Sequence, residues 1–341
     1  MSFMSFLFLF LIFFIFSVIT TGFIRNFSIK NNLFDIPNNR SSHTTPKPKG
    51  GGIVIVIPLI VTLIILFFQG MIEIQITKGI VLGLILVAII GLIDDYKNLA
   101  ASIRVIVYLI SAGLSLHFIG GLESVTVNEI SYYLGNIGYY SGLLFLLWLT
   151  NLYNFMDGTD GFAAAQTICV SVFCFFLFYS SDDVPFSIIM LCLASTSIGF
   201  LYWNWAPAKI FMGDVGSCTI GLFFGLLAIH TENKGTISIF VWAILLAPFI
   251  ADATLTLIKR IFNNENWHEA HNSHAYQKLY QHGLTHDQLA LKLILINILL
   301  IWPLAYIAHT YQNYSLFVLV LSYLIMATIW FLIQSQYKRS T

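Results

Sequence analysis

Charged residues are scarce in this chain of 341 amino acids, of which only 9% are Asp, Glu, Lys or Arg, against roughly 25% in soluble proteins. Hydrophobic residues make up 58%, and 30 positions are phenylalanine. A soluble globular protein cannot hide so much apolar surface from water, so the composition excludes that class and indicates an integral membrane protein. The formal net charge is zero, and no nucleic-acid partner is expected.

Cysteine is also rare, and no C-x-x-C pair occurs, so neither a disulfide framework nor a redox motif is expected. The four cysteines lie in apolar runs typical of buried packing: Cys169, Cys174, Cys192 and Cys218. The first apolar run, near 3–23, has no preceding basic residues and no small-residue cleavage site, so we expect a retained span. Without an internal repeat, linker or soluble domain, residues 1–341 are expected to form a single domain.

Apolar runs of about 17–25 residues, the length that crosses a bilayer as a helix, recur along the whole chain. The predicted fold class is therefore all-α and polytopic, with about eleven transmembrane helices. They are expected near residues 3–23, 51–68, 78–93, 101–119, 137–152, 162–179, 186–203, 217–231, 236–258, 291–309 and 314–334.

The distribution of Lys and Arg predicts the orientation. The first loop is rich in basic residues, which places it in the cytoplasm and the N-terminus outside. Eleven spans then leave only Lys78 and Lys234, of sixteen Lys and Arg, on the far side, and the C-terminus is cytoplasmic. The cytoplasmic loops are expected at about 24–50, 94–100, 153–161, 204–216 and 259–290.

Four polar clusters fall on this cytoplasmic side. They are GLIDDYKN with Asp94 and Asp95, NLYNFMDGTDG with Asn151, Asn154, Asp157 and Asp160, NWAPAKIFMGDVGS with Lys209 and Asp214, and NWHEAHNSHAYQ with His268, His271 and His274. Ionised acids beside hydrocarbon are costly and need a partner. A single Asp is explained equally well as a solvated helix end, but five together favour a shared cation. Mg²⁺ suits them, since it takes oxygen ligands and completes its shell with water and phosphates; Mn²⁺ is an alternative.

The spacing inside the second cluster predicts a break in the helix. Four polar residues recur at every third position from Asn151 to Asp160. On an α-helix each such step drifts by about 60°, so the first and last would point in opposite directions. We therefore expect the helix to end near Asp157, followed by a glycine turn that lets the backbone approach a ligand. A wet, acidic pocket facing the cytoplasm follows.

Several residues are predicted to bind an anion. Lys209 can place a positive charge beside a phosphate, and GDVGS offers free amides at a helix N-terminus. Further candidates lie in the first loop, although anchoring at the membrane surface also explains a basic loop. They are Arg40, His43, Lys47 and Lys49.

The three histidines before the tenth span have more than one interpretation. Zinc is disfavoured, because the three-residue steps lack a fourth ligand and no cysteine is near. A solvated helical face remains open. Binding of phosphate or sugar hydroxyls is favoured, since imidazole titrates near neutrality.

Taken in order, these motifs resemble those of the polyprenyl-phosphate N-acetylhexosamine-1-phosphate transferases, glycosyltransferase family 4. The resemblance runs from DIPNNRSSHTTPKPKGGG to HEAHNSHAYQKL and so covers nearly the whole chain. It implies transfer of a sugar-1-phosphate from a UDP-sugar to undecaprenyl phosphate, with release of UMP. It also implies a bacterial inner-membrane enzyme that initiates O-antigen or related cell-envelope glycan synthesis.

The resemblance assigns roles to the acids. Asp94 and Asp95 look like the paired acids near the lipid phosphate. Asn154 and Asp214 look like Mg²⁺ ligands. A direct attack by the lipid phosphate is favoured, and a covalent intermediate on one of the paired acids is the alternative.

The resemblance also assigns the substrate side. Asp157 and Asp160 look like acids that shape the nucleotide pocket, and His268, His271 and His274 look like a loop that binds the sugar diphosphate. Asn151 is grouped with these substrate-binding residues.

Departures from the family pattern bear on the sugar. The histidines are interrupted as HEAHNSH, and positions Lys97 and Asn98 carry no acid. Both features argue against a muramyl-pentapeptide. The EAHNSHAYQ form resembles O-antigen initiators that use UDP-N-acetylfucosamine or UDP-N-acetylquinovosamine, with UDP-N-acetylglucosamine left open. A homodimer is left open as well.

Other classes of membrane protein fit the sequence less well than a transferase. An ion-coupled transporter would gather polar groups at the bilayer midplane and often shows paired halves, whereas these groups collect at one face. A purely structural scaffold leaves the acids unexplained.

Overall fold

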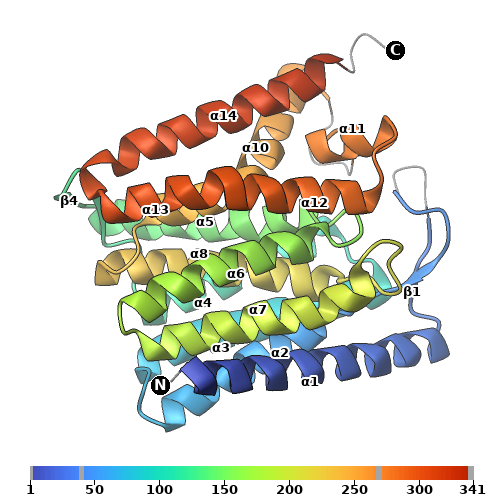
Figure 1. The fold of residues 1–341 in the computed structure, drawn as a ribbon, viewed down its shortest axis with the longest axis horizontal. Helices are drawn as coiled ribbons and strands as arrows, with labels where there is room; N and C mark the ends of the chain where they lie inside the picture. Colours follow the sequence, from blue (N-terminus) through green and yellow to red (C-terminus); the bar gives the residue numbers. More distant parts are fainter. Residues whose placement is uncertain (1–2, 38–41, 266–270, 337–341) are drawn as a thin grey trace.

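A computed structural model describes residues 3–37, 42–265 and 271–336 (Figure 1). The protein is a bundle of helices with two short β-hairpins, which confirms the all-α class. The elements are α1 Phe3–Lys30, β1 Phe34–Asp35, β2 Lys47–Pro48, α2 Ile53–Phe68, α3 Ile74–Lys97, α4 Ala101–Ile119, β3 Ser124–Val127, β4 Ile130–Tyr133, α5 Gly135–Phe155, α6 Phe162–Ser180, α7 Val184–Asn204, α8 Asp214–Lys234, α9 Ile239–Leu245, α10 Ala247–Phe262, α11 Ala275–Gln281, α12 His286–Ile296, the π-helix η1 Asn297–Ile301, α13 Trp302–Thr310, the 3₁₀ turn η2 Gln312–Tyr314 and α14 Ser315–Gln336.

Each of the eleven predicted apolar segments contains helix. Within the described residues, eight helices have the length and composition needed to cross a membrane, or nine if a bent pair counts as one span. The chain is therefore a multi-pass membrane protein. The count of eleven spans and the orientation stay predictions.

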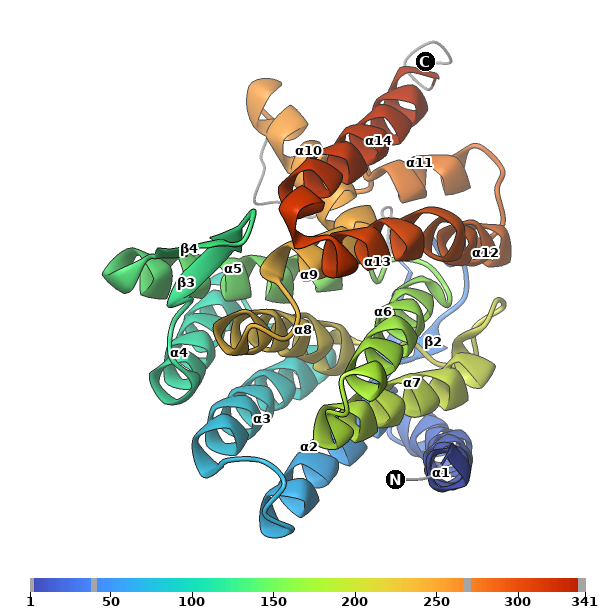
Figure 2. The ribbon, with the colours of Figure 1, turned by 60° about the vertical axis from the view of Figure 1, so that its left-hand side comes forward.

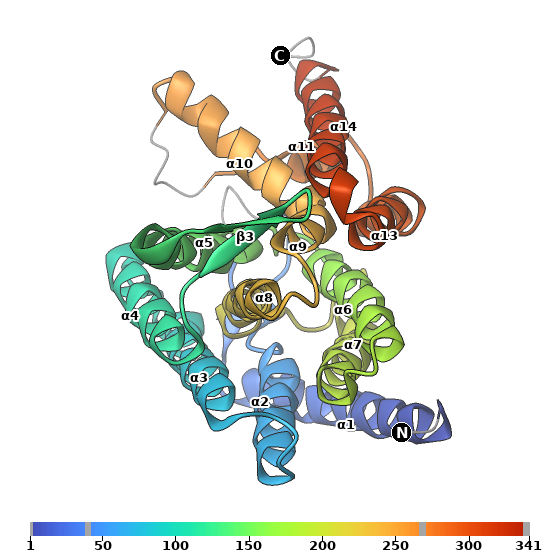
Figure 3. The same ribbon diagram turned by 90° about the vertical axis from the view of Figure 1, so that its left-hand side faces the viewer.

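Helix α8 forms the centre of the bundle. Viewed along the helices, it is surrounded by α2, α3, α5 and α6 (Figure 3). Of the residues in its apolar stretch, 94% are buried inside the protein. Close packing depends on small residues: a Cβ on Gly221 would lie 2.4 Å from the Leu149 carbonyl oxygen of α5. Helices in lipid associate through such contacts, because hydrocarbon provides no hydrophobic drive between them.

The ninth predicted span, 236–258, is not a straight helix, because α9 and α10 meet at 77° and α10 points away from the bundle (Figure 2). Pro248 has no N–H to continue the helical ladder. The Phe249 N–H turns to the Leu246 carbonyl instead, which leaves the Leu245 carbonyl without its helical partner. Gln166 of α6 compensates, since its amide donates to that carbonyl at 2.9 Å.

The hairpin β3–β4 closes the end of the bundle opposite β1 (Figures 1 and 3). Its backbone is tied to the C-terminus of α8: Glu232 Oε1 accepts the Thr126 N–H at 2.8 Å, and Oε2 accepts the Ile239 N–H at 2.6 Å. Asn233 donates to the Gly121 carbonyl at 2.8 Å. The polar side chains of Glu232 and Asn233 therefore form hydrogen bonds to backbone groups that hold this end together.

Candidate active site

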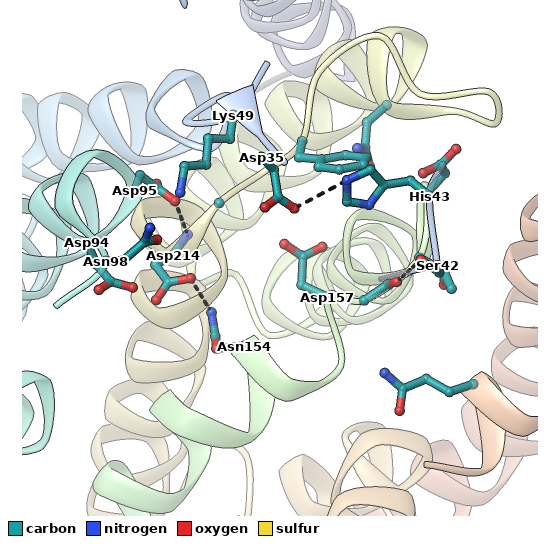
Figure 4. A pocket seen from close by; sticks show the side chains of 17 residues that line it. Asp35, Ser42, His43, Lys49, Asp94, Asp95, Asn98, Asn154, Asp157 and Asp214 are labelled. Carbon is teal, nitrogen blue, oxygen red and sulfur yellow. Dashed lines mark hydrogen bonds and ion pairs between the residues drawn. The ribbon is translucent and has the colours of Figure 1, made fainter. Parts of the chain in front are cut away.

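A cavity of about 470 Å³ opens at the other end of the bundle, where α3 and α5 end and α8 begins (Figure 4). All four predicted clusters and the first loop supply its wall, the fourth through Gln277 alone, and six of the lining residues are aspartates. The wall consists of Asp35, Ser42, His43, Lys49, Asp94, Asp95, Asn98, Asn154, Asp157, Gly158, Thr159, Asp160, Asn204, Phe211, Gly213, Asp214 and Gln277. Residues separated by more than 200 positions thus meet in one polar chamber.

The N-terminus of α8 binds a carboxylate of the chain itself. The Asp214 N–H donates to Asp95 Oδ1 at 3.2 Å, and the Val215 N–H donates to Asp95 Oδ2 at 3.4 Å. The two amides at the start of this helix, expected to be free for a substrate anion, are therefore taken. Gly213 is required beside them, since its φ is +77° and a Cβ would lie 2.4 Å from Asp95 Oδ2. Asp95 fixes α8 to α3.

Arg104 of α4 bridges two of the acids. Its Nη1 lies 3.0 Å from Asp94 Oδ2 and 2.6 Å from Asp214 Oδ2. Asp94 is held further by the Leu99 N–H, which donates to Oδ1 at 2.5 Å. These charge-assisted bonds fix the two carboxylates side by side. Arg104 was not among the predicted site residues; its only signal was a lone arginine in the fourth apolar run.

Asn154 and Asp214, the predicted metal ligands, lie in contact. The Asn154 amide nitrogen donates to Asp214 Oδ1 at 2.7 Å and to Ser217 Oγ at 3.1 Å. No group of three or more His, Cys, Asp or Glu in the described residues is arranged to hold a metal. The side chains of Asp214, Asn154 and Ser217 can, however, offer oxygen atoms as metal ligands. Mg²⁺ needs few protein carboxylates when water and phosphates complete its shell.

The surroundings of Asp157 indicate that the cavity can accommodate a cation. It lies in the short loop between α5 and α6, as the glycine spacing predicted. Burial raises the pKa of its carboxyl well above the ordinary value, and the nearby charges of Asp214 and Asp95 raise it further. Negative charge in the cavity therefore exceeds the compensation that the chain supplies. The residues present fit a hard divalent cation.

Asp160 is compensated, in contrast to Asp157. Its Oδ1 lies 3.2 Å from His286 Nδ1, and its Oδ2 accepts the Ala208 N–H at 2.8 Å. Burial acts to raise the pKa of Asp160, but the bonds from His286 and Ala208 outweigh it and lower that pKa below the ordinary value. Asp160 therefore joins the α5–α6 loop to the segment before α8 and to α12.

The first loop covers the other side of the cavity. His43 Nε2 lies 3.8 Å from Asp35 Oδ2, and its ring stands edge-on to Phe211 at 4.9 Å. Ser42 Oγ donates to the Gly158 carbonyl at 2.5 Å. The predicted His43 thus reaches the cavity, whereas Arg40 lies outside the described residues.

Two predicted substrate-binding residues do not line the cavity. Lys209 is exposed, and its ammonium lies 5.6 Å and 5.4 Å from the ring centres of Tyr202 and Trp203, a cation–π arrangement. The Asn151 amide donates to the Leu147 carbonyl of its own helix at 2.8 Å. Their predicted roles have no support from this geometry.

The described histidines of the fourth cluster gather beside α10 instead. His274 is buried, with Nδ1 3.7 Å from Asp252 Oδ1, and the His271 ring lies 4.8 Å from it. Burial and the neighbouring His274 lower the pKa of His271 to about 4. Asp252 holds His274 in this position, because it accepts the N–H of the next residue, Ala275, at 2.8 Å and so caps the start of α11. His268 lies outside the described residues.

Sequence reasoning missed several of these contacts. Asp252 was visible as a lone acid within an apolar run, a pattern that marks buried polar sites in membrane proteins. Asp35 and His286 had no such signal, because each lies in a polar segment where a charged residue is ordinary.

The part of the chain that resembles known proteins includes several acids of the cavity. A family model described as glycosyl transferase family 4 matches residues 77–232. The matched segment supplies Asp94, Asp157 and Asp214, so the acidic wall lies in the part of the chain that carries the family likeness.

Curated relatives extend the likeness over most of the chain. It is 29% identical over 289 residues to the probable undecaprenyl-phosphate N-acetylglucosaminyl 1-phosphate transferase of Bacillus subtilis (strain 168), across 82% of this chain and 78% of that protein. It is 27% identical over 324 residues to the decaprenyl-phosphate N-acetylglucosaminephosphotransferase of Mycolicibacterium smegmatis, across 81% and 75%. A phospho-N-acetylmuramoyl-pentapeptide-transferase of Streptococcus agalactiae is 28% identical over 219 residues, across 60% and 64%.

Proposed function

We propose that this chain transfers an N-acetylated amino-sugar-1-phosphate from a UDP-sugar to undecaprenyl phosphate and releases UMP. The observation that carries the proposal is the acidic cavity at one end of a membrane bundle, most of whose aspartates lie in the segment that matches the model of glycosyl transferase family 4. There a soluble nucleotide sugar can meet a lipid phosphate. We place the enzyme in the bacterial inner membrane with the cavity facing the cytoplasm, where UDP-sugars are made.

The chemistry needs positioning more than covalent help. An oxygen of the lipid phosphate forms a bond to the sugar-bearing phosphorus of the UDP-sugar. The bond from that phosphorus to the oxygen shared with the uridine-bearing phosphate breaks, and UMP leaves with its electron pair. A proton still on the attacking phosphate passes to Asp94 or Asp95. Catalysis then depends on fixed charges aimed at the phosphates.

Several polar residues of the cavity have a role in this scheme. Asn154 and Asp214 would hold Mg²⁺, or Mn²⁺, which supplies positive charge while two anionic phosphates approach. Arg104 holds the Asp214 carboxylate at 2.6 Å and so fixes one of these two ligands. Asp157 and Asp160 flank the nucleotide side of the cavity.

The sugar is proposed as an N-acetylhexosamine. Two relatives named for N-acetylglucosamine support that sugar, whereas the interrupted histidines favour N-acetylfucosamine or N-acetylquinovosamine. A muramyl-pentapeptide donor is the second candidate, because one relative carries that name. We assign the reaction to the first step of O-antigen or related envelope glycan synthesis.

The test uses the purified protein in detergent with undecaprenyl phosphate, Mg²⁺ and a panel of UDP-sugars that includes UDP-N-acetylmuramyl-pentapeptide, with UMP measured over time. We expect UMP only when both the lipid phosphate and one N-acetylhexosamine donor are present. UMP released without lipid would indicate a hydrolase. Absence of UMP with every donor would contradict the proposal and return the transporter to consideration.

A further inference from the structure

Tyr276 lies between the end of α5 and the start of α6. It is the second residue of α11, and its side chain is buried. Its hydroxyl donates to the Phe155 carbonyl at 3.0 Å, in the last turn of α5, where carbonyls have no partner within the helix. Its ring stacks on that of Phe162, with the ring centres 4.8 Å apart. One side chain thus contacts both ends of the loop that joins α5 to α6. We call residues 156–161 the acid loop, because two aspartates of the cavity lie in it.

Asp252 of α10 holds α11 in this place. Its Oδ1 accepts the Ala275 N–H at 2.8 Å, and its Oδ2 accepts the Tyr276 N–H at 3.2 Å. Thr256, one turn further along α10, donates to Oδ1 at 3.1 Å. A carboxylate that accepts the first amides of a helix satisfies donors that have no partner inside that helix and stabilises its start. The phenol of Tyr276 therefore reaches the acid loop from a fixed base.

The acid loop approaches Tyr276 closely at Gly158. A Cβ at this position would meet the Tyr276 hydroxyl, and the next nearest atoms, Gln277 Nε2 and Tyr276 Cζ, would lie 3.3 Å away. On the other side, Ser42 Oγ of the first loop donates to the Gly158 carbonyl at 2.5 Å. Glycine is required at this position because the hydroxyl leaves no room for a side chain.

The position of Asp157 depends on the backbone of the acid loop. Two other acids of the cavity are fixed through their side chains, since Asp95 accepts amides of α8 and Asp160 accepts the Ala208 N–H. In the described part of the chain, the Asp157 carboxylate accepts no hydrogen bond (Figure 4). A residue that holds the acid loop therefore also places this carboxylate at the cavity wall.

We propose that Tyr276 is a positioning residue of the transfer reaction, which holds the acid loop so that Asp157 stays at the cavity wall. The inference rests on the proposed function for the reaction itself. It adds a residue that acts through the loop, since Tyr276 does not line the acidic cavity and its hydroxyl binds the Phe155 carbonyl. Asp252 is the base of the same connection.

A matched pair of tyrosine variants tests this role. Tyr276→Phe removes the bond to Phe155 and keeps the ring. Tyr323→Phe removes an equivalent bond, because the Tyr323 hydroxyl donates to the Ala243 carbonyl at 3.1 Å, and neither of these two residues lines the acidic cavity. Both variants should melt slightly below wild type, since each loses one hydrogen bond to a main-chain carbonyl.

The kinetics of the two variants should differ. We expect only Tyr276→Phe to lower kcat/KM for the UDP-sugar, by about tenfold, because small displacements of positioned groups slow a reaction strongly. KM for undecaprenyl phosphate stays within about twofold of wild type in both variants. An unchanged kcat/KM in Tyr276→Phe, or equal losses in the two variants, would overturn the proposal.

Gly158→Ala tests the contact from the side of the acid loop. Its methyl group would meet the Tyr276 hydroxyl, so we expect kcat/KM for the UDP-sugar to fall by about a hundredfold. Combination with Tyr276→Phe removes the obstructing oxygen and leaves the nearest atoms at 3.3 Å. The double variant should therefore be about as active as Tyr276→Phe alone, which is a non-additive result. Losses that add in the double variant would show that Tyr276 does not set the position of the loop.

UMP release by the wild-type protein separates this proposal from the proposed function. If the wild type releases UMP and the two tyrosine variants lose activity equally, the transfer reaction stands and the role of Tyr276 is removed. If the wild type releases no UMP with any donor, the transfer reaction fails and the role of Tyr276 fails with it.

Discussion

The two ends of α8 treat polar side chains differently. At its C-terminal end, Glu232 and Asn233 bind backbone amides and a carbonyl of the neighbouring loops, so their polarity is used to close the fold. At its N-terminal end, Asp95 does the same for the helix amides, but Asp157 is left with like charges around it. The difference shows that the N-terminal end of α8 holds more acidic side chains than its structural bonds require, which marks that end as the site.

Asp214→Asn breaks this comparison most strongly. We expect kcat to fall by about 10²–10³-fold, the usual cost of losing one group that stabilises charge in the transition state. The protein should still fold, because an amide keeps the shape and its oxygen can still accept a hydrogen bond, although the ion pair with Arg104 is lost. UMP release and a thermal melt measured on the same preparation check both parts; turnover near the wild-type rate would show that Asp214 holds no essential cation.

Gly213→Ala and Gly235→Ala compare the two ends directly. Both glycines flank α8 with positive φ, +77° and +67°. Gly235 lies in the left-handed helical region, where alanine costs about 1 kcal/mol, whereas Gly213 has ψ 171°, a region that almost only glycine adopts, so its alanine is strained more. Only at Gly213 would the new Cβ also strike the Asp95 carboxylate. We expect roughly ten- to hundredfold lower kcat for Gly213→Ala and near-normal kcat for Gly235→Ala. Equal activity losses would mean that strain alone is responsible.

Asp157→Asn tests the uncompensated charge. The folded state raises the pKa of this carboxyl above 3.8, so the ionised form destabilises the protein, and that cost grows as the pH rises above about 4. Without divalent cations, the variant should melt higher than wild type, by a larger margin at pH 8 than at pH 5. Added Mg²⁺ should reduce the margin. A margin that shrinks with rising pH would show that Asp157 already has a partner.

Glu232→Gln has the smallest expected effect on catalysis. It weakens two charge-assisted bonds to the hairpin and to α9, at a cost of about 0.5–1.5 kcal/mol in stability. UMP release should stay within about twofold of wild type. A large loss of activity with intact folding would extend the functional site to the closed end.

The sequence predicted the helices well because burial in lipid leaves a direct hydropathy signal. It also predicted that Asp94, Asp157 and Asp214 would share one end, since the Lys and Arg bias sets the parity of the spans. The glycine turn after Asp157 followed from the three-residue spacing of the polar side chains together with Gly158 and Gly161. These features depend on local pattern, which a single sequence contains.

Contacts across the bundle could not be predicted in this way. Arg104 reaches an aspartate 110 residues away, and Asp95 caps a helix that begins 119 residues later. Both depend on how α3, α4 and α8 pack, which hydropathy does not specify. Lys209 failed to reach the cavity for the same reason, because aromatic rings of the preceding helix offered its ammonium a nearer partner.

The most direct test of the central claim is a titration of the purified protein with Mn²⁺, followed by electron paramagnetic resonance. If the acids at the N-terminal end of α8 form the cation site, wild type and Glu232→Gln bind the ion alike, and Asp214→Asn loses most of that affinity. Mn²⁺ bound equally tightly by Asp214→Asn would contradict the account.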